Sequence, residues 1–350
     1  METRSADINL KSRKTAANYS GQPVCSGILR QFAAITAASA FAQAAIMPIR
    51  PLPPLQAWHW LVQAINLGMR NPRAIFGAAL LLVGSLYAMV MAGGVLVALF
   101  GGGEVSTPTL LITLLMVVAI FMMMPILAGG LMHVIAEAEA GRPTAARDLY
   151  RPFALGRAGR LAALGGLQIL LMAAGMLITR QLAGEEYMAA YNEALNSIMQ
   201  NPQQAPTQLP APAHPLLMFV WQVCLNYFTA ITMLLGIALI ALSNSSVLAA
   251  IKSAALAAVR NLAANFLAIT LFFVLTMLSA VLLSMVLSMV MLLLGALFMP
   301  LALLVTFVLG MCFAAVLLVI VCGGGYLIWR DTFAAAPEAP TLATQGSIEL

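Results

Sequence analysis

The sequence predicts an all-α fold, a polytopic transmembrane helical bundle. Of its 350 residues, 62% are hydrophobic and only 8% are charged, whereas about a quarter of the residues in an average soluble domain carry charge. Uncharged runs near the ~20 residues that a helix needs to cross a bilayer recur along the chain. These runs are apolar on every face instead of alternating, which excludes the strands of a membrane β-barrel.

Six spans are predicted from these runs. They cover residues 74–100, 108–133, 161–179, 216–242, 264–292 and 300–328. The uncharged stretch 261–329 is long enough for three short spans or for two long, tilted ones. Two spans are favoured, because an even total places all the basic connections on one side of the membrane.

The basic residues predict the orientation. Of the 17 Lys and Arg residues, only Arg180 falls on one side of the six-span scheme and all the others fall on the opposite side. Basic connections stay in the cytoplasm, so both termini are expected there. The same residues are dispersed beside spans, which indicates membrane lipid as a partner and argues against nucleic acid.

The two ends of the chain differ from its middle. Residues 1–46 are polar and basic, then rich in alanine. We expect either a disordered cytoplasmic tail or an extension from a start codon assigned too early, with Met47 as the true first residue. Residues 336–350 are expected to form a disordered tail. The membrane domain is therefore expected to cover residues 47–335.

Two segments outside the spans have the pattern of interfacial amphipathic helices. In residues 55–70, apolar side chains recur at 3-4-3-4 spacing beside a polar stripe, and residues 245–260 repeat the arrangement. Arg70-Asn71 and Arg260-Asn261 stand at matching positions before the next span, and the loop 145–160 is a poorer third copy. The sequence thus predicts three units, each an interfacial helix followed by a hairpin of spans.

Polar side chains within the spans are few. Gln222, Asn226 and Thr229 share one face of the fourth span. They are candidates for lining a polar cavity, and the alternative is that they form hydrogen bonds between helices.

Polar and aromatic residues at the ends of the spans form a second group of candidates. His133 and Glu137, one helical turn apart, are suited to bind metal or relay a proton, or else simply cap the second span. Aromatic and basic side chains in such places anchor helices in the interface. The expected anchors are Trp58, Trp60, Arg70, Tyr326, Trp329 and Arg330.

Short motifs resemble those of a known family. They are Met47-Pro48-Ile49-Arg50, the Trp58/Trp60 helix, Arg70-Asn71-Pro72, Gly129-Gly130-Leu131, Gly141-Arg142-Pro143 with Asp148-Leu149, and the stretch from Tyr326 to Phe333. In these the chain resembles an uncharacterised bacterial family of six-span inner-membrane proteins, and is similar to the membrane domain fused to some glycerophosphodiester phosphodiesterases. The resemblance implies the architecture and an inner-membrane location, and it implies no activity.

Motifs that carry enzyme chemistry are not found. The sequence has no nucleophile elbow, phosphate-binding glycine loop, zinc-ligand spacing or pair of buried carboxylates. We therefore expect no catalytic, cofactor-binding or metal-binding residues. The sequence favours a non-enzymatic membrane protein that acts through lipid or partner contacts, and the alternative is a permease or channel for a small neutral or amphiphilic solute.

Overall fold

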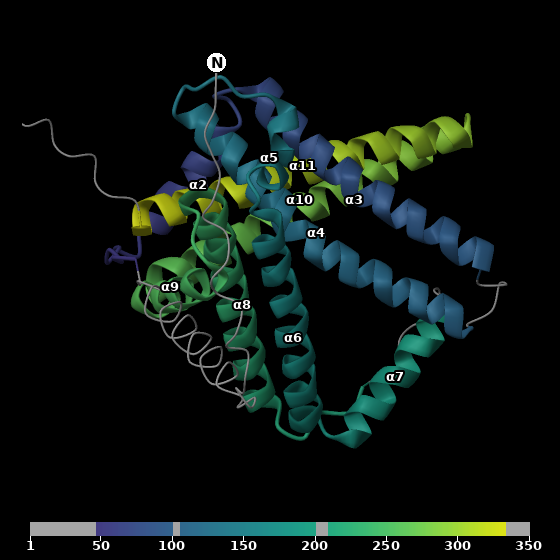
Figure 1. The fold of residues 1–350 in the computed structure, drawn as a ribbon. Helices are drawn as coiled ribbons and strands as arrows, with labels where there is room; N and C mark the ends of the chain where they lie inside the picture. The colour runs from purple at the N-terminus through teal and green to yellow at the C-terminus, as the bar shows by residue number, and fades with distance from the viewer. Residues whose placement is uncertain (1–46, 101–105, 201–208, 334–350) are drawn as a thin grey trace, which may run out of the picture. The chain divides into compact units, whose positions relative to one another are not determined.

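The computed structural model describes residues 47–100, 106–200 and 209–333, in which all regular structure is helical (Figure 1). The predicted tails 1–46 and 336–350 lie outside the described residues. The elements are α2 (Gln56–Leu67), α3 (Pro72–Phe100), α4 (Thr107–Glu139), the 3-10 helix η1 (Ala146–Tyr150), α5 (Arg151–Ala154), α6 (Ala158–Ala183), α7 (Glu185–Gln200), α8 (Pro215–Ser243), α9 (Val247–Arg260), α10 (Leu262–Gly295) and α11 (Met299–Phe333).

Six of these helices are long and apolar enough to cross a membrane, and they are the six that the sequence predicts. They are α3, α4, α6, α8, α10 and α11. The all-α, multi-pass fold is therefore confirmed. Two helices extend well past the predicted ends, α4 to Glu139 and α11 to Phe333, and an ion pair between Glu139 and Arg330 joins these extensions at 2.6 Å.

The spans pack most closely at one end. Burial in α4 runs from Pro125 to Ala138, in α8 from Tyr227 to Ala241, and in α11 chiefly from Ala315 to Phe333. These stretches meet on the same side because successive spans alternate in direction. We call this side, which carries Arg70, Arg142, Arg151, Arg157 and Arg330, the basic end.

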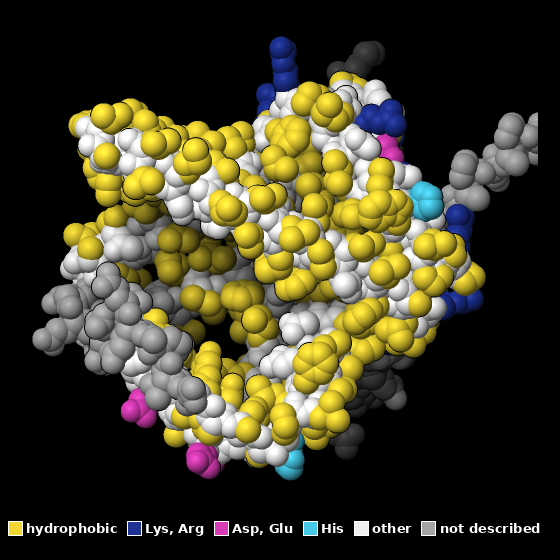
Figure 2. All heavy atoms as spheres, turned by 180° about the vertical axis from the view of Figure 1, so that it is seen from behind, with side chains coloured by type: hydrophobic (Ala, Val, Ile, Leu, Met, Phe, Trp, Pro, Cys, Tyr) yellow, Lys and Arg dark blue, Asp and Glu magenta, His cyan; other side chains and the backbone are white. Residues whose placement is uncertain are grey.

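Toward the other end the spans separate and expose apolar side chains. In Figure 1, the pair α3–α4 diverges from the pair α6–α8, and α7 lies beyond the end of α6. Figure 2 shows a face covered mostly by hydrophobic side chains, with Lys and Arg gathered toward one edge. Such faces require a hydrocarbon environment, as expected for helices that cross a bilayer.

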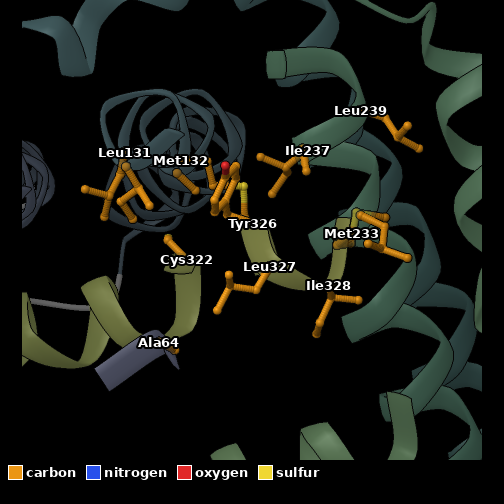
Figure 3. Packing of buried hydrophobic residues seen from close by; sticks show 14 of the residues in the cluster. Ala64, Leu131, Met132, Met233, Ile237, Leu239, Cys322, Tyr326, Leu327 and Ile328 are labelled. Atoms are coloured by element: carbon orange, nitrogen blue, oxygen red, sulfur yellow. The ribbon is translucent and has the colours of Figure 1, made fainter. Parts of the chain in front are cut away.

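The core at the basic end depends on close helix approach. Tyr326, Leu327 and Ile328 of α11 lie between residues of α4 and α8 (Figure 3). Gly130 of α4 faces the carbonyl oxygen of Leu149 so closely that a Cβ would overlap it. Small residues allow helix backbones to approach in this way.

The expected order of short helix and hairpin is present, with one difference. Helix α2 precedes the α3–α4 hairpin, and α9 precedes α10–α11. The third segment is instead divided into η1 and the single turn α5. Pro152 at the start of α5 and Gly156, with a φ of 65°, account for the break, because proline cannot donate within a helix and a positive φ ends one.

We expect Gly130→Ala to lower the free energy of unfolding by about 1–3 kcal/mol, because the added methyl group forces α4 and η1 apart. The matched control is Gly84→Ala in α3, where a Cβ would meet nothing within 4 Å. It should be neutral or stabilising by up to about 1 kcal/mol. Thermal unfolding in detergent measures both, and equal effects would contradict the close-packing argument.

Candidate functional site

Helix α2 is held against the last span by one carboxylate. Asp331 of α11 accepts hydrogen bonds from the indole nitrogen of Trp60 at 2.8 Å and from the amide of Gln56 at 2.9 Å. The neighbouring Arg330 donates to the other carboxylate oxygen at 2.9 Å. Hydrogen bonds to a charged group are stronger than those between neutral groups, so Asp331 fixes where α2 lies.

Arg330 extends this network to α4. Its guanidinium donates to Glu139 at 2.6 Å and to the side-chain oxygen of Gln63 on α2 at 3.3 Å. One arginine thus joins α2, α4 and α11. Because two carboxylates, Glu139 and Asp331, neutralise it, this part of the basic end carries little net charge.

The two apolar faces of α2 have different surroundings. One face, formed by Ala57, Trp60, Ala64 and Leu67, is buried against the protein. The other face is the stripe predicted from the sequence, and it is exposed. Its members are Leu55, Trp58, Val62, Ile65 and Met69, with Leu55 and Trp58 exposed by 73% and 56%. A helix that exposes such a stripe beside a polar face is suited to lie in a membrane interface.

The structure corrects the interpretation of two expected anchors. Trp60 is completely buried and Tyr326 almost so. Both pack inside the protein, so neither anchors a helix by lying on its surface in the membrane interface. Trp329 and Arg330 are half-buried, whereas Trp58 and Arg70 are exposed. The spacing of aromatic residues does not distinguish Trp58 from Trp60, because the partner Asp331 of Trp60 is far away in the sequence.

Two arginines cap the end of α8. Arg160 donates to the backbone oxygens of Asn244 and Ser245 at 2.9 and 3.0 Å, and Arg157 donates to the carbonyl oxygen of Ala241. The last carbonyls of a helix lack partners within it and favour cations. Burial and the neighbouring Arg160 lower the pKa of Arg157.

The loop between α4 and α6 is fixed by Asp148. Its carboxylate accepts a hydrogen bond from the backbone N–H of Ala145 at 2.8 Å and one from the Thr144 hydroxyl at 3.3 Å. The backbone hydrogen bond is the main reason that the pKa of Asp148 is lowered. This turn holds η1 against α4 and so places Arg151, the first residue of α5.

A basic pocket of about 340 Å³ opens beside this loop. His133 and Glu137 both line it, but the carboxylate of Glu137 is bound by Arg142, with Nη2 at 2.8 Å from Oε1. His133 and Glu137 therefore line the same pocket, but the hydrogen bonds of the Glu137 carboxylate are formed with Arg142 instead of His133. Also lining the pocket are Ala136, Ala140, Arg142, Arg151, Leu155, Arg157, Leu242, Tyr326 and Trp329.

A second pocket, of about 430 Å³, lies between α6 and α8 within the spans. Gln222, Asn226 and Thr229 all line it, together with Gln168 and Thr179 of α6. The amide of Gln222 donates to the Thr179 hydroxyl at 3.3 Å, and that of Asn226 donates to the backbone oxygen of Gln222 at 2.8 Å. The three residues thus lie along one pocket, and Gln222 also forms a hydrogen bond from α8 to α6.

Sequence reasoning identified parts of these sites but not their assembly. The sequence assigns Arg151 and Arg157 to the basic side of the membrane and places both in the third repeat segment, 145–160. It does not predict that they share the basic pocket with His133, Tyr326 and Trp329. The number of arginines in the loop between the second and third spans could have indicated a basic site. The partners of that loop on α8 and α11, however, are distant in the sequence.

Comparisons with known proteins add no relative, since no protein-family model, curated protein or solved structure matches the chain. The resemblance to the six-span bacterial family therefore stays a prediction. Any function must be inferred from the contacts that the chain itself makes.

Replacing Trp60 with phenylalanine should lower the free energy of unfolding by about 1–3 kcal/mol, because it removes a buried hydrogen bond to a carboxylate. Trp58→Phe is the matched control, two residues away on the exposed stripe, and should have almost no effect. Thermal unfolding of both variants in detergent tests this. A loss of stability for Trp58→Phe as large as that for Trp60→Phe would contradict the assignment of the two faces of α2.

Proposed function

We propose that this integral membrane protein is not an enzyme and acts through contacts with membrane lipid made at its basic end. The exposed apolar stripe of α2 carries the proposal. A soluble environment would leave five large apolar side chains in water, whereas the boundary between head groups and acyl chains accommodates them.

The basic residues support the same placement. Arg70 follows the stripe directly, and exposed or half-buried arginines lie around the ends of α4, α6 and α11. Guanidinium groups at this level attract the anionic head groups of the cytoplasmic leaflet. We infer accordingly that the basic end faces the cytoplasm of a bacterial cell, with the spans in the inner membrane and both termini inside.

Anionic lipid should stabilise the protein more than zwitterionic lipid does. Protein purified in a neutral detergent is titrated with phosphatidylglycerol or with phosphatidylcholine of the same acyl chains, and the unfolding midpoint is followed. We expect the larger rise with phosphatidylglycerol, reduced at high salt because exposed charges are screened. Equal responses to the two lipids would refute a function based on head-group contacts.

A second candidate function is the passage of a small neutral or amphiphilic solute along the pocket between α6 and α8. The observation in its favour is that polar side chains of α6 and α8, among them Gln222, Asn226 and Thr229, gather along one pocket in helices that are otherwise apolar. Polar side chains inside a bilayer are costly and often mark a solute pathway.

Asn226→Leu tests the second candidate, because it replaces a polar group of the pocket by an apolar one of similar size. If solute passes there, glycerol uptake by proteoliposomes should fall toward that of protein-free vesicles, as measured by light scattering after rapid mixing. Thr229→Val in the pocket and Thr270→Val on the exposed face of α10 form a matched pair. Uptake that is unaffected by both pocket variants would exclude this pathway.

A further inference from the structure

The basic pocket contains more positive than negative charge. Three arginines, Arg142, Arg151 and Arg157, line it against the single carboxylate of Glu137. Asp148 also acts electrostatically on His133 in the pocket, and its Oδ2 atom accepts hydrogen bonds from Ala145 and Thr144; the three arginines still outnumber these two carboxylates. The pocket therefore favours an anion.

The three arginines differ in how far they are already engaged. Arg142 is held by Glu137 through two of its N–H groups, and Arg157 is held by the carbonyl of Ala241. Arg151 forms no ion pair with any residue in the described part of the chain, although Glu137 and Asp148 lie near enough to act on it electrostatically. An arginine has five N–H donors, so Arg151 has donors for a ligand and the other two arginines add charge.

A second pocket at the basic end contains less positive charge that is not balanced by a carboxylate. It is lined by Arg70, Arg330 and Glu139, and the Arg330 guanidinium is already bound by two carboxylates. In the described part of the chain, Arg70 is thus the one arginine of that pocket without an ion pair, whereas Arg151 and Arg157 both line the basic pocket without one. The contrast singles out the pocket that contains Arg151.

The lining of the pocket is also amphipathic. Leu155 and Leu242 provide apolar walls, and Tyr326 and Trp329 contribute aromatic rings beside the arginines. A pocket of about 340 Å³ lies at the lower end of the range of about 300–1,000 Å³ found for small-molecule sites. The size and lining suit a charged head group joined to an apolar body.

We infer that this pocket binds a phosphate group, with Arg151 as its principal ligand and Arg142 and Arg157 as supporting charges. Arginine presents a fork of donors that matches phosphate oxygens. The phosphate is that of a phospholipid head group or a free phosphate, and the apolar walls favour the phospholipid. The inference rests on the proposed function only if the bound phosphate group belongs to a lipid.

The test compares two variants that remove the same charge from the same loop. Arg151→Gln changes the pocket, whereas Arg147→Gln changes an exposed arginine of η1 that does not line it. The unfolding midpoint of the full chain in neutral detergent is followed against phosphatidylglycerol, and in a separate arm against inorganic phosphate with sodium chloride at matched ionic strength. We expect Arg151→Gln to raise the concentration needed for half of the stabilisation about tenfold, the order expected from losing one charge-assisted hydrogen bond, and Arg147→Gln to leave it nearly unchanged.

Each outcome decides the inference. An Arg151-dependent response to phosphatidylglycerol supports it and identifies lipid as the source. If the response depends on Arg151 only with inorganic phosphate, the site is supported and its ligand is free phosphate. The site then gives no support to the proposed function, which requires lipid. The site is overturned if the wild type prefers phosphatidylglycerol and Arg151→Gln does not alter that preference. It is also overturned if Arg147→Gln weakens the preference as much as Arg151→Gln does. In both cases the proposed function stands.

A charge-conserving variant keeps the test decisive if Arg151→Gln does not fold. Arg151→Lys retains the positive charge but lacks the forked donors of arginine. We expect Arg151→Lys to respond to phosphatidylglycerol or phosphate more weakly than the wild type and Arg147→Gln do, but still measurably. A full wild-type response in Arg151→Lys would, in that case, overturn the role of Arg151 as a forked ligand.

Discussion

The structure depends on the cost of placing charge in hydrocarbon. Charged side chains of the six apolar helices lie near helix ends in the described residues, and most lie at the basic end. Arg330 shows how that end accommodates them, since it is paired with Glu139 and Asp331 at the point where three helices meet. Ion pairing there allows α4 and α11 to continue as helices beyond their uncharged segments. Without such partners, these charges would shorten the spans.

The same constraint explains why the helices are joined at one end. Water-exposed polar groups can fix one helix to another only where the chain leaves the hydrocarbon, and Asp331, Arg157 and Arg160 do so through hydrogen bonds to distant elements. Farther along the spans, apart from the hydrogen bond between Gln222 and Thr179, contact is left to apolar packing, which lipid tails can replace. Burial is accordingly deep beside the arginines and sparse toward the opposite end.

The features of this fold that depend on composition and helical periodicity could be predicted from the sequence. The six spans, the exposed stripe of α2 and the polar face of α8 follow from hydropathy and helical spacing, and all are present in the structure. The burial of Trp60 and Tyr326 could not be predicted, because it depends on partners more than 60 residues away in the sequence, Asp331 for Trp60 and the core of α4 and α8 for Tyr326. For the same reason, the gathering of Arg151 with His133 and Trp329 in one pocket follows only from the fold.

Under the proposed function, selectivity for particular lipids would arise at the basic end. In a bilayer, the apolar faces of α3, α10 and α11 would contact acyl chains alone, and acyl chains are shared by lipids whose head groups differ. The polar groups of the pocket between α6 and α8 lie within the spans, and Gln222 and Asn226 already make hydrogen bonds there. At the basic end, by contrast, a guanidinium without an ion-pair partner in the described chain stands beside apolar and aromatic walls. As a binding site, that combination would distinguish one head group from another, because it would favour a ligand that joins an anion to an apolar body.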